Sequence, residues 1–505
     1  MSFTNKKIIK ILEHYKTIWA LNYAAGLAQW DLNTYMPPDG APARGEAMAK
    51  LSTLCQKLFL DRKFMALIEK AGEEKKLSDA EKGVARTLKK DLRNYQKLPP
   101  EFLEEFERVT SEAHVAWRES KQSSDFSRFA PFLERIVDLN RRKADYLGYE
   151  GHPYDALINE FEEGWTTKDL DDFFSGFRSG LKEILDQVLS RPGYSPSAPL
   201  AEMPYNRAAM ERVNREILDY LRVDPRRLRL DASPHPFTQG LTNRDVRITT
   251  WYAAKDFGAS VSSTIHEFGH ALYEAQVGDA LQFTPIGGGR SLGLHESQSR
   301  FWENMVGRSR AFAEKFMKSF QGLSTEIDEY LEKEGVEGVH RYFNLVKPGL
   351  IRVEADEVTY HFHVILRFYL EKSLLEGTAK VRDLPEIWNQ SMERFLGVAP
   401  KNDAEGVLQD IHWSMGAMGY FPTYSIGTFL SAMWREAMEE EFGDLDEFLL
   451  REEAVERIQK WLREKVHRHG AAYTLKDLVK RSIGKDFSTE PMLKYLRKKY
   501  LANDF

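Results

Sequence analysis

The sequence predicts a mostly α-helical protein with one small region of β-strand. Apolar residues recur at spacings of three and four along most of the 505-residue chain, which is typical of amphipathic helices. Proline, glycine and serine separate these runs, as at Pro99-Pro100 and in residues 191–204. One β-branched, alternating segment, residues 245–251, breaks the helical pattern. We therefore expect a helical body that includes a small β-sheet.

The helical runs succeed one another from near the amino end to near the carboxyl end. Ser78 and Glu81 fit a capping box that opens the first of them, because each side chain can bind the backbone N–H of the other. The loop at residues 191–204 lies between two helical runs, so we interpret it as a hinge rather than a domain linker. The predicted helices span residues 79–95, 101–121, 170–190, 205–221, 260–277, 309–333, 354–375, 424–442 and 452–469.

The predicted strand at residues 245–251 ends just before the helix at 260–277, which we expect Gly278 to stop. A strand beside this helix has two possible uses. Its free edge can pair with the backbone of an extended peptide. Alternatively, it forms a small hairpin that only braces the fold.

Length, charge and cysteine content limit the classes of protein. A chain of 505 residues exceeds one small core, and we expect a single unit over residues 1–505 with a helical amino-terminal region at about 1–190. The net charge of −6 argues against binding to nucleic acid or an anionic membrane. Cys55 is the only cysteine, which excludes an intramolecular disulfide and favours a cytoplasmic location. The most apolar early stretch, residues 18–30, is too short to span a bilayer.

The segment His-Glu-Phe-Gly-His at residues 266–270 carries the strongest chemical signal. Residues four apart on a helix share a face, so His266 and His270 can bind one metal ion. Glu267 then lies beside the metal, where it can take a proton from bound water. Because about three in a hundred chains of this composition would contain the pattern by chance, the motif needs support from residues elsewhere in the chain.

A hydrolytic zinc site usually has three protein ligands, so a third is required. After the glycine triplet at 287–289, the next predicted helical segment holds His295 and Glu296, and Glu296 lies 26 residues after His270. That separation lets one helix end and a second return alongside it. We predict that Glu296 is the third ligand and that His295 is its rival, since adjacent helix positions differ by about 100° in direction. A solvent-exposed Glu296 on an amphipathic helix is the ordinary alternative.

Further motifs accompany this segment in a fixed order. They are His235-Pro236-Phe237, Asp-Val-Arg-Ile-Thr at 245–249, the pentad at 266–270, His-Glu-Ser-Gln at 295–298, Ile-Arg-Val-Glu-Ala-Asp at 351–356 and Gly-Val-Leu-Gln-Asp-Ile-His-Trp at 406–413, with Trp30-Asp31 and Met36-Pro37 before them. Together they resemble the carboxypeptidase Taq family of zinc metallocarboxypeptidases, from about residue 30 to the carboxyl end.

This resemblance implies a helical fold similar to those of neurolysin and angiotensin-converting enzyme, with two lobes around a deep substrate groove, and usually a homodimer. It implies one Zn²⁺ per chain held by His266, His270 and Glu296, with Glu267 as the catalytic general base. The implied activity releases carboxyl-terminal amino acids from peptides with broad specificity by attack of metal-activated water. Co²⁺ can take the place of Zn²⁺, since a site of two histidines and one carboxylate accepts several divalent ions.

The family-like motifs also supply candidates for stabilising a negatively charged tetrahedral intermediate, which needs a donor besides the metal. We assign His412 and Tyr420 to catalysis and Tyr424 to substrate binding. Packing in the core is the alternative for each tyrosine. For His412, the alternative is a hydrogen-bonded structural role beside Trp413.

A carboxypeptidase must recognise a free carboxylate, for which arginine offers bidentate geometry. Arg352 is our first candidate and Arg247 the second, and we also assign His235 to substrate binding. Arg352 stands four residues before Asp356, so an ion pair within a helix is an equally good reading. Arg247 can likewise pair with Asp245, and Asp356 can instead orient a ligand histidine from behind.

Two other functions compete with this interpretation. The first is a zinc oligo-endopeptidase of the related groove-shaped families, which would cut peptides internally and tolerate an amidated carboxyl end. The second is a zinc-binding scaffold or peptide-binding module without activity. Such a module would have no need of the general base, yet Glu267 is present.

Overall fold

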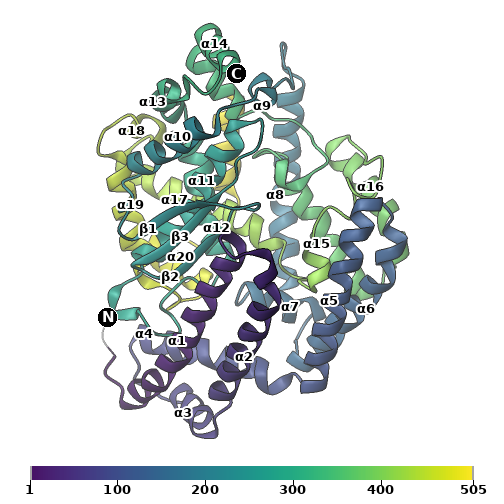
Figure 1. Ribbon diagram of the computed structural model, residues 1–505, viewed down its shortest axis with the longest axis vertical. Coiled ribbons are helices and arrows are strands. Elements are labelled where there is room, and N and C mark those ends of the chain that lie inside the picture. The colour runs from purple at the N-terminus through teal and green to yellow at the C-terminus, as the bar shows by residue number, and fades with distance from the viewer. Residues whose placement is uncertain (1–2, 503–505) are drawn as a thin grey trace. The chain divides into compact units, whose positions relative to one another are not determined.

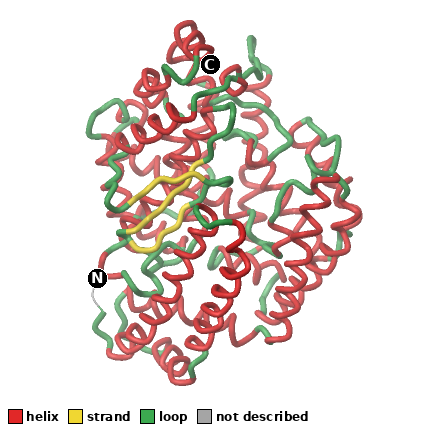
Figure 2. Tube along the Cα trace, in the orientation of Figure 1, coloured by secondary structure: helices red, strands yellow, loops and turns green. Residues whose placement is uncertain are grey.

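Helices form most of the computed structural model, which describes residues 3–502, and strands form one small sheet (Figures 1 and 2). The mostly α-helical class with a small β-sheet is therefore confirmed. The described chain divides into two compact units, each assembled from segments far apart in the sequence. Unit 1 extends to Tyr95 and includes Ala198–Phe343 and Met433–Phe487; unit 2 includes Gln96–Ser197 and Asn344–Ala432 and resumes at Ser488.

Unit 1 contains the helix with the His-Glu-Phe-Gly-His motif, α11 (Phe257–Gln276). α12 (Leu292–Arg300) carries the His-Glu-Ser-Gln motif at residues 295–298, and it continues as the π-helix η3 (Phe301–Gly307). The other helices that lie wholly in unit 1 are α1 (Lys6–Thr34), η1 (Pro38–Gly40), α2 (Ala41–Phe59), α3 (Arg62–Gly72), α9 (Pro199–Glu202), α10 (Arg207–Tyr220), η2 (Asp279–Leu281), α13 (Arg310–Phe320), α14 (Thr325–Phe343), α18 (Leu445–Phe448), α19 (Ala454–Lys465), η7 (His467–His469) and α20 (Leu475–Ile483).

The sheet of unit 1 has three strands in the order β1 (Leu228–Ala232), β3 (Asp245–Thr250), β2 (Thr238–Thr242). β3 pairs in parallel with β1 and antiparallel with β2. Figure 1 shows α11 beside the sheet, and α11 packs against both β2 and β3. The predicted strand is confirmed, but its predicted free edge is wrong, because β3 is central and both its edges are paired. The alternative of a hairpin that braces the fold agrees with the β2–β3 pairing.

α11 begins and ends close to the predicted bounds of 260–277, but the predicted role of Gly278 is wrong. The helix ends at Gln276, and Gly278 has a φ of −59°, so it is not a left-handed cap. A Cβ atom on Gly278 would lie 2.9 Å from the carbonyl oxygen of Arg468. Close approach of another backbone segment, rather than helix termination, therefore explains this glycine.

The helix predicted at residues 309–333 is two helices, α13 and α14. The chain turns at Gly322, whose φ of +81° strongly favours glycine. Ser324 then caps α14, since its hydroxyl accepts the backbone N–H of Ile327 at 3.3 Å. Apolar periodicity continues through this turn, which is why the pattern alone did not reveal it.

Unit 2 contains the predicted motifs at residues 351–356 and 406–413. η4 (Arg352–Glu354) precedes α15 (Tyr360–Glu376), and η6 (His412–Met415) precedes α17 (Pro422–Phe442), which runs on into unit 1. The remaining helices are α5 (Pro100–Ser123), α6 (Phe126–Leu147), α7 (Pro153–Phe161), α8 (Thr167–Leu189), η5 (Val381–Asp383), α16 (Leu384–Leu396) and α21 (Glu490–Leu501), together with the end of α4 (Asp79–Lys97).

The helix predicted at 354–375 starts later, at Tyr360. The Asp356 carboxylate accepts the backbone N–H groups of Val358 and Thr359 at 2.9 and 3.0 Å. An aspartate that binds the backbone two and three residues ahead forms a turn or an N-cap rather than a helix interior. Residues 352–356 are therefore outside the helix.

Two other local predictions can be compared with the structure. The capping box of α4 is confirmed, because Ser78 N donates to Glu81 Oε2 at 2.9 Å and Glu81 N donates to Ser78 Oγ at 3.4 Å. The loop at 191–204 includes the unit boundary between Ser197 and Ala198, so it connects the units. Within residues 3–502, no helix combines the length and apolar character needed to cross a membrane.

Candidate metal centre

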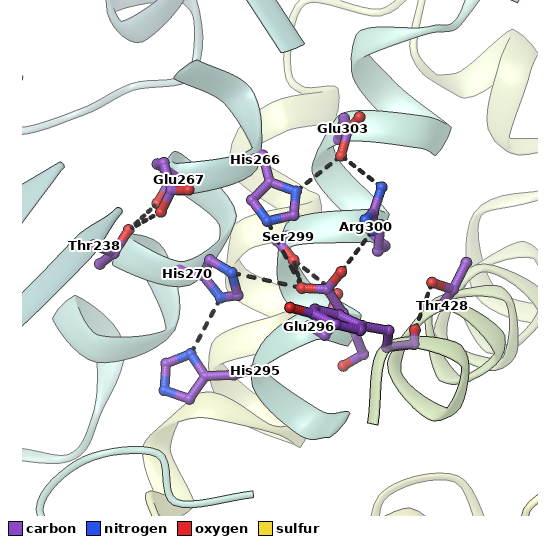
Figure 3. Close-up of polar contacts among 12 residues, drawn as sticks. Thr238, His266, Glu267, His270, His295, Glu296, Ser299, Arg300, Glu303 and Thr428 are labelled. Atoms are coloured by element: carbon purple, nitrogen blue, oxygen red, sulfur yellow. Dashed lines mark hydrogen bonds and ion pairs between the residues drawn. The ribbon is translucent and has the colours of Figure 1, made fainter. Parts of the chain in front are cut away.

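α11 places His266, Glu267 and His270 as the sequence predicted, with both imidazoles on one side of the helix. The two ring centroids lie 5.0 Å apart. Figure 3 shows both rings pointing toward Glu296, which comes from α12. Glu296 is only 6% exposed, so the alternative of a solvent-exposed glutamate is wrong.

Gly269 allows α11 and α12 to approach closely enough to bring these side chains together. A Cβ atom on Gly269 would lie 2.5 Å from the carbonyl oxygen of Gln298 and 2.6 Å from Cα of Ser299. Both atoms belong to the backbone of α12, so no side chain can rotate away to make room. The glycine inside the motif is therefore part of the architecture of the site.

One ligand atom from each of His266, His270 and Glu296 lies within 4.8 Å of the other two. Nε2 of each histidine is 3.7 Å from Oε2 of Glu296. That separation is too long for a hydrogen bond. It is close to the distance of about 3.4 Å between two ligands of a tetrahedral ion with bonds of about 2.1 Å. The three donors therefore fit one divalent cation.

His266 is oriented by Glu303, which lies on the π-helix η3. Nδ1 of His266 is 2.8 Å from Glu303 Oε2, which leaves Nε2 to face Glu296. Arg300 Nη1 and Arg308 Nη2 donate to Glu303 at 3.2 and 2.6 Å. Such a carboxylate behind a histidine ligand fixes the ring and its tautomer.

His270 is oriented differently, because its Nδ1 contacts a second imidazole rather than a carboxylate. His295 Nδ1 lies 3.3 Å away, and His295 Nε2 lies 2.8 Å from Glu274 Oε1. Glu274 also accepts the backbone N–H of Gly289 at 2.9 Å. His295, the predicted rival ligand, thus touches a candidate ligand and does not join the three-donor group.

Glu296 is held so that one carboxylate oxygen faces the histidines. Arg300 Nε donates to Oε1 at 2.7 Å, and Ser299 Oγ donates to Oε2 at 3.1 Å. Arg300 therefore binds both Glu296 and Glu303. The Oε2 atom of Glu296 remains directed at the two Nε2 atoms (Figure 3).

The charges around the site favour a cation. Burial lowers the pKa of His266, but Glu296 and Glu303 outweigh burial and raise this pKa above its ordinary value. Burial, with the neighbouring His266, holds the pKa of His270 well below its ordinary value, so this imidazole is neutral. Burial also opposes ionisation of Glu303, yet Arg300 and Arg308 hold its pKa far below the usual range. The ionised Glu303 behind His266 and the neutral imidazole of His270 both suit a metal ion.

Glu267 is 6% exposed and lies on the same helix as the two histidines. Thr238 of β2 donates its hydroxyl to Glu267 Oε2 at 2.6 Å (Figure 3). Burial raises the pKa of Glu267, and the negative charges of Glu296 and Glu303 add to this effect. The sheet thus has a direct function in the site, because β2 fixes the carboxylate that comes after the first histidine.

Unit 2 brings together a second group of predicted residues. Arg352 donates to Asp410 Oδ1 through Nε and Nη2 at 3.0 and 2.9 Å, and to the Tyr360 hydroxyl at 3.0 Å. Arg367 Nε donates to the other Asp410 oxygen at 2.7 Å. Both arginines are buried. Asp410 therefore ties together two motifs that are distant in the sequence.

His412 and the two predicted tyrosines lie in the same unit. His412 Nε2 is 3.3 Å from the Tyr424 hydroxyl, and the Tyr420 ring lies 5.1 Å from the His412 ring. Burial lowers the pKa of His412 to about 4, against the opposing effect of Asp410. His412 is therefore a neutral imidazole near pH 7, with one N–H to donate.

Three predicted contacts of the charged residues can be compared with the structure. An Arg352–Asp356 ion pair within a helix is wrong, because Asp356 binds the backbone N–H of Lys347 and Thr359 instead. The histidine-orienting role suggested for Asp356 is filled by Glu303 and His295. The suggested Arg247–Asp245 ion pair is confirmed, with two contacts of 2.9 and 3.0 Å. His235, predicted to bind substrate, is exposed in unit 1.

Sequence reasoning missed several residues that support the site. Glu274 had a usable signal, since it lies four residues after His270 and so shares its helix face. No signal in the sequence pointed to Glu303, because its position depends on a π-helical segment. Thr238 belongs to a strand that was not predicted. Nothing in the sequence distinguishes Arg300 from an ordinary arginine on the surface of a helix.

Comparison with known proteins agrees with the geometry. The family model described as Carboxypeptidase Taq (M32) metallopeptidase matches residues 10–500. Thermostable carboxypeptidase 1 of Pyrococcus furiosus is 45% identical over 500 residues and covers 99% of both chains. Carboxypeptidase 1 of Bacillus subtilis is 36% identical over 98% of this chain and 96% of its own. The solved Pyrococcus furiosus carboxypeptidase has a TM-score of 0.96 at 44% identity, over 99% of this chain and 100% of its own. The M32 carboxypeptidase of Deinococcus radiodurans has a TM-score of 0.93 at 35% identity, over 98% of this chain and 99% of its own.

Proposed function

The chain belongs to the carboxypeptidase Taq (M32) family of metallopeptidases and is a metallocarboxypeptidase, and we propose that it uses Zn²⁺ to release carboxyl-terminal amino acids from peptides with broad specificity. The observation that carries the metal assignment is the group of three donors from α11 and α12, His266, His270 and Glu296. Two imidazoles and one carboxylate are a common ligand set for catalytic zinc. We expect one Zn²⁺ per chain, and Co²⁺ can replace it.

We propose Glu267 as the general base. When bound, the metal would supply an acidified water and polarise the scissile carbonyl. Glu267 takes the water proton and passes it to the departing amine. Its support is its place after the first histidine, its burial, and the Thr238 hydroxyl that fixes its orientation.

We propose that His412 and Tyr420 assist catalysis by donating hydrogen bonds to the developing negative oxygen. A neutral His412 can donate from one ring nitrogen, and a tyrosine hydroxyl can do the same. We propose Tyr424 as a substrate-binding residue, supported by its contact with His412. These roles predict that each single variant loses turnover while it retains bound zinc.

We propose Arg352, with Arg247 and His235, for recognition of the peptide and its free carboxylate. Arg352 also holds Asp410, so it has a structural function in addition to any contact with substrate. Arg247 is similarly held by Asp245. The arginine that recognises the carboxylate is the one whose loss harms peptides with a free carboxyl end more than amidated peptides.

The family resemblance is the basis for three further proposals. We expect one catalytic unit over residues 1–505 with two lobes around a groove, a homodimer, and a cytoplasmic location. A single cysteine agrees with a reducing compartment. Light scattering combined with gel filtration tests the dimer, since it gives the mass of the particle in solution.

The experiment that tests the proposed function joins a variant to a defined peptide pool. Glu267→Gln should keep near-normal zinc by elemental analysis while hydrolysis falls by about 10²- to 10⁴-fold or more, because the proton acceptor is gone. Glu46→Gln is the control, since this glutamate is exposed on α2. Mass spectrometry of the wild-type digest should show ladders shortened from the carboxyl end of many sequences. The ladders should stop with a chelator and be absent for amidated peptides. Cleavage of amidated peptides, or normal hydrolysis by Glu267→Gln, would contradict the proposal.

A further inference from the structure

The two histidine ligands of the proposed metal centre are supported in chemically different ways. His266 contacts the carboxylate of Glu303 directly, whereas His270 contacts the imidazole of His295. A carboxylate stands behind His295 as well, because Glu274 is 2.8 Å from the far ring nitrogen. The second ligand therefore begins a chain of three side chains, in the order His270, His295, Glu274 (Figure 3 shows the two histidines).

The proton positions along this chain follow from hydrogen-bond chemistry. Nε2 of His270 faces Glu296, so a metal at the three donors would use Nε2 and leave the proton on Nδ1. His270 then donates from Nδ1, and Nδ1 of His295 accepts. The remaining proton of His295 is on Nε2, where Glu274 accepts it. This pattern satisfies both contacts, because a carboxylate accepts a hydrogen bond and has no N–H to donate.

Three surrounding glycines make room for His295 and Glu274. A Cβ atom on Gly289 would lie 2.4 Å from Nε2 of His295. A Cβ on Gly288 would lie 2.9 Å from Glu274 Oε2, and a Cβ on Gly240 of β2 would lie 2.8 Å from Glu274 Cγ. The φ angles of these glycines do not require glycine, since none is in the left-handed region. Their absent side chains therefore create space for the two residues.

We propose that His295 and Glu274 are positioning residues that fix the ring and tautomer of His270 for metal binding, and we call this pair the His295–Glu274 relay. The inference deepens the proposed zinc site and rests on it. His295 is excluded as a third imidazole ligand because its Nδ1 faces Nδ1 of His270, while its Nε2 is held by Glu274. Loss of such an outer partner typically weakens metal binding by about 10- to 100-fold.

The dissociation constant for Zn²⁺, measured by competition with a chromophoric chelator, tests the relay without reference to turnover. His295→Leu removes the imidazole that faces Nδ1 of His270, and the dissociation constant should rise by about 10- to 100-fold. His295→Asn keeps a polar acceptor near the position of Nδ1, so it should recover most of that loss. Glu274→Gln should raise the dissociation constant several-fold in the wild-type background and have no further effect in His295→Leu. In the Co²⁺-loaded protein, the visible absorption band should shift in His295→Leu and return in His295→Asn.

Asp279→Asn is the matched control, because this carboxylate is exposed just beyond the end of α11. Its dissociation constant should stay within about twofold of wild type. Values within twofold of wild type for both His295→Leu and Glu274→Gln would overturn the relay, and so would a His295→Asn variant as weak as His295→Leu. If His295→Leu does not fold, Glu274→Gln and His295→Asn carry the test. A wild-type protein that binds no Zn²⁺ would instead contradict the proposed metal centre itself.

Discussion

Replacing Gly269 by alanine tests whether the close contact of α11 with α12 sets the geometry of the metal centre. In an unconstrained helix interior this substitution would stabilise the protein by about 1 kcal/mol, because alanine has the higher helix propensity. Here the new Cβ atom would lie 2.5 Å from the carbonyl oxygen of Gln298 and 2.6 Å from Cα of Ser299. Whether the substitution stabilises or destabilises the protein depends on whether α12 can move away from α11.

The size of the expected loss of stability follows from those two distances. To reach an ordinary contact of 3.4 Å, the carbonyl oxygen must move by about 0.9 Å. Overpacking of this kind costs about 1–3 kcal/mol, so it cancels or exceeds the gain in helix propensity. α12 also carries Glu296, so the ligand oxygen would move away from the two histidines, whereas metal–ligand distances tolerate only about 0.2 Å. We expect the dissociation constant for Zn²⁺ to rise by at least about tenfold.

The assay pairs the melting temperature of the metal-free protein with chelator competition for Zn²⁺. Gly45→Ala is the control, because Gly45 lies inside helix α2 and a Cβ there would meet nothing within 4 Å. It should stabilise the protein by about 0.5–1 kcal/mol and leave zinc affinity unchanged. If Gly269→Ala behaved like Gly45→Ala in both measurements, the close helix contact would not be what places the ligands.

Three further variants have defined outcomes. Glu296→Ala should lower bound zinc in elemental analysis, because two imidazoles alone hold the ion weakly; an unchanged stoichiometry would point to another ligand. Arg352→Ala should weaken hydrolysis of free-carboxylate peptides more than amidated ones, and equal losses would make its contact with Asp410 the whole of its role. Glu371 accepts N–H groups of Trp413 and Gly419 at 2.9 Å each, and burial raises its pKa to about 7. The folded protein then binds more protons than the unfolded chain between pH 4.5 and 7, so stability should fall by about 2 kcal/mol from pH 5 to pH 7. Glu371→Gln should remove that slope in denaturant titrations, and a variant with the wild-type slope would assign it to other groups.

The proposed ligand residues could be predicted from the sequence because their geometry is local. A four-residue spacing on one helix places His266 and His270 together whatever the rest of the chain does. Glu296 needed one non-local assumption, that the next helix returns beside the first. Gly269 makes that return possible, and its position inside the motif was visible in the sequence, but the backbone it contacts was not.

The failed predictions share a dependence on non-local partners. β3 was identified from its own residues, yet its central position depends on β1 and β2, whose sequences contain charged residues and glycine. The Arg352–Asp356 pair assumed that a spacing of four implies a helix. Asp356 instead binds backbone N–H groups ahead of it, which starts the helix later and leaves Arg352 to bind Asp410.

Two kinds of residue in the proposed metal centre should differ in what their loss changes. Residues that position the ligands should change metal affinity, whereas Glu267 should change turnover. Catalytic geometry must be held within about 0.5 Å. In the proposed centre, a backbone contact at Gly269 and contacts from Glu303, His295 and Arg300 surround the three donors. Because these residues act through the ligands, their loss should appear first in metal affinity. Glu267 is supported from β2, since Thr238 donates a hydrogen bond to its carboxylate. Its loss should therefore reduce turnover at full metal occupancy, which would distinguish the proposed general base from every residue proposed to position the ion.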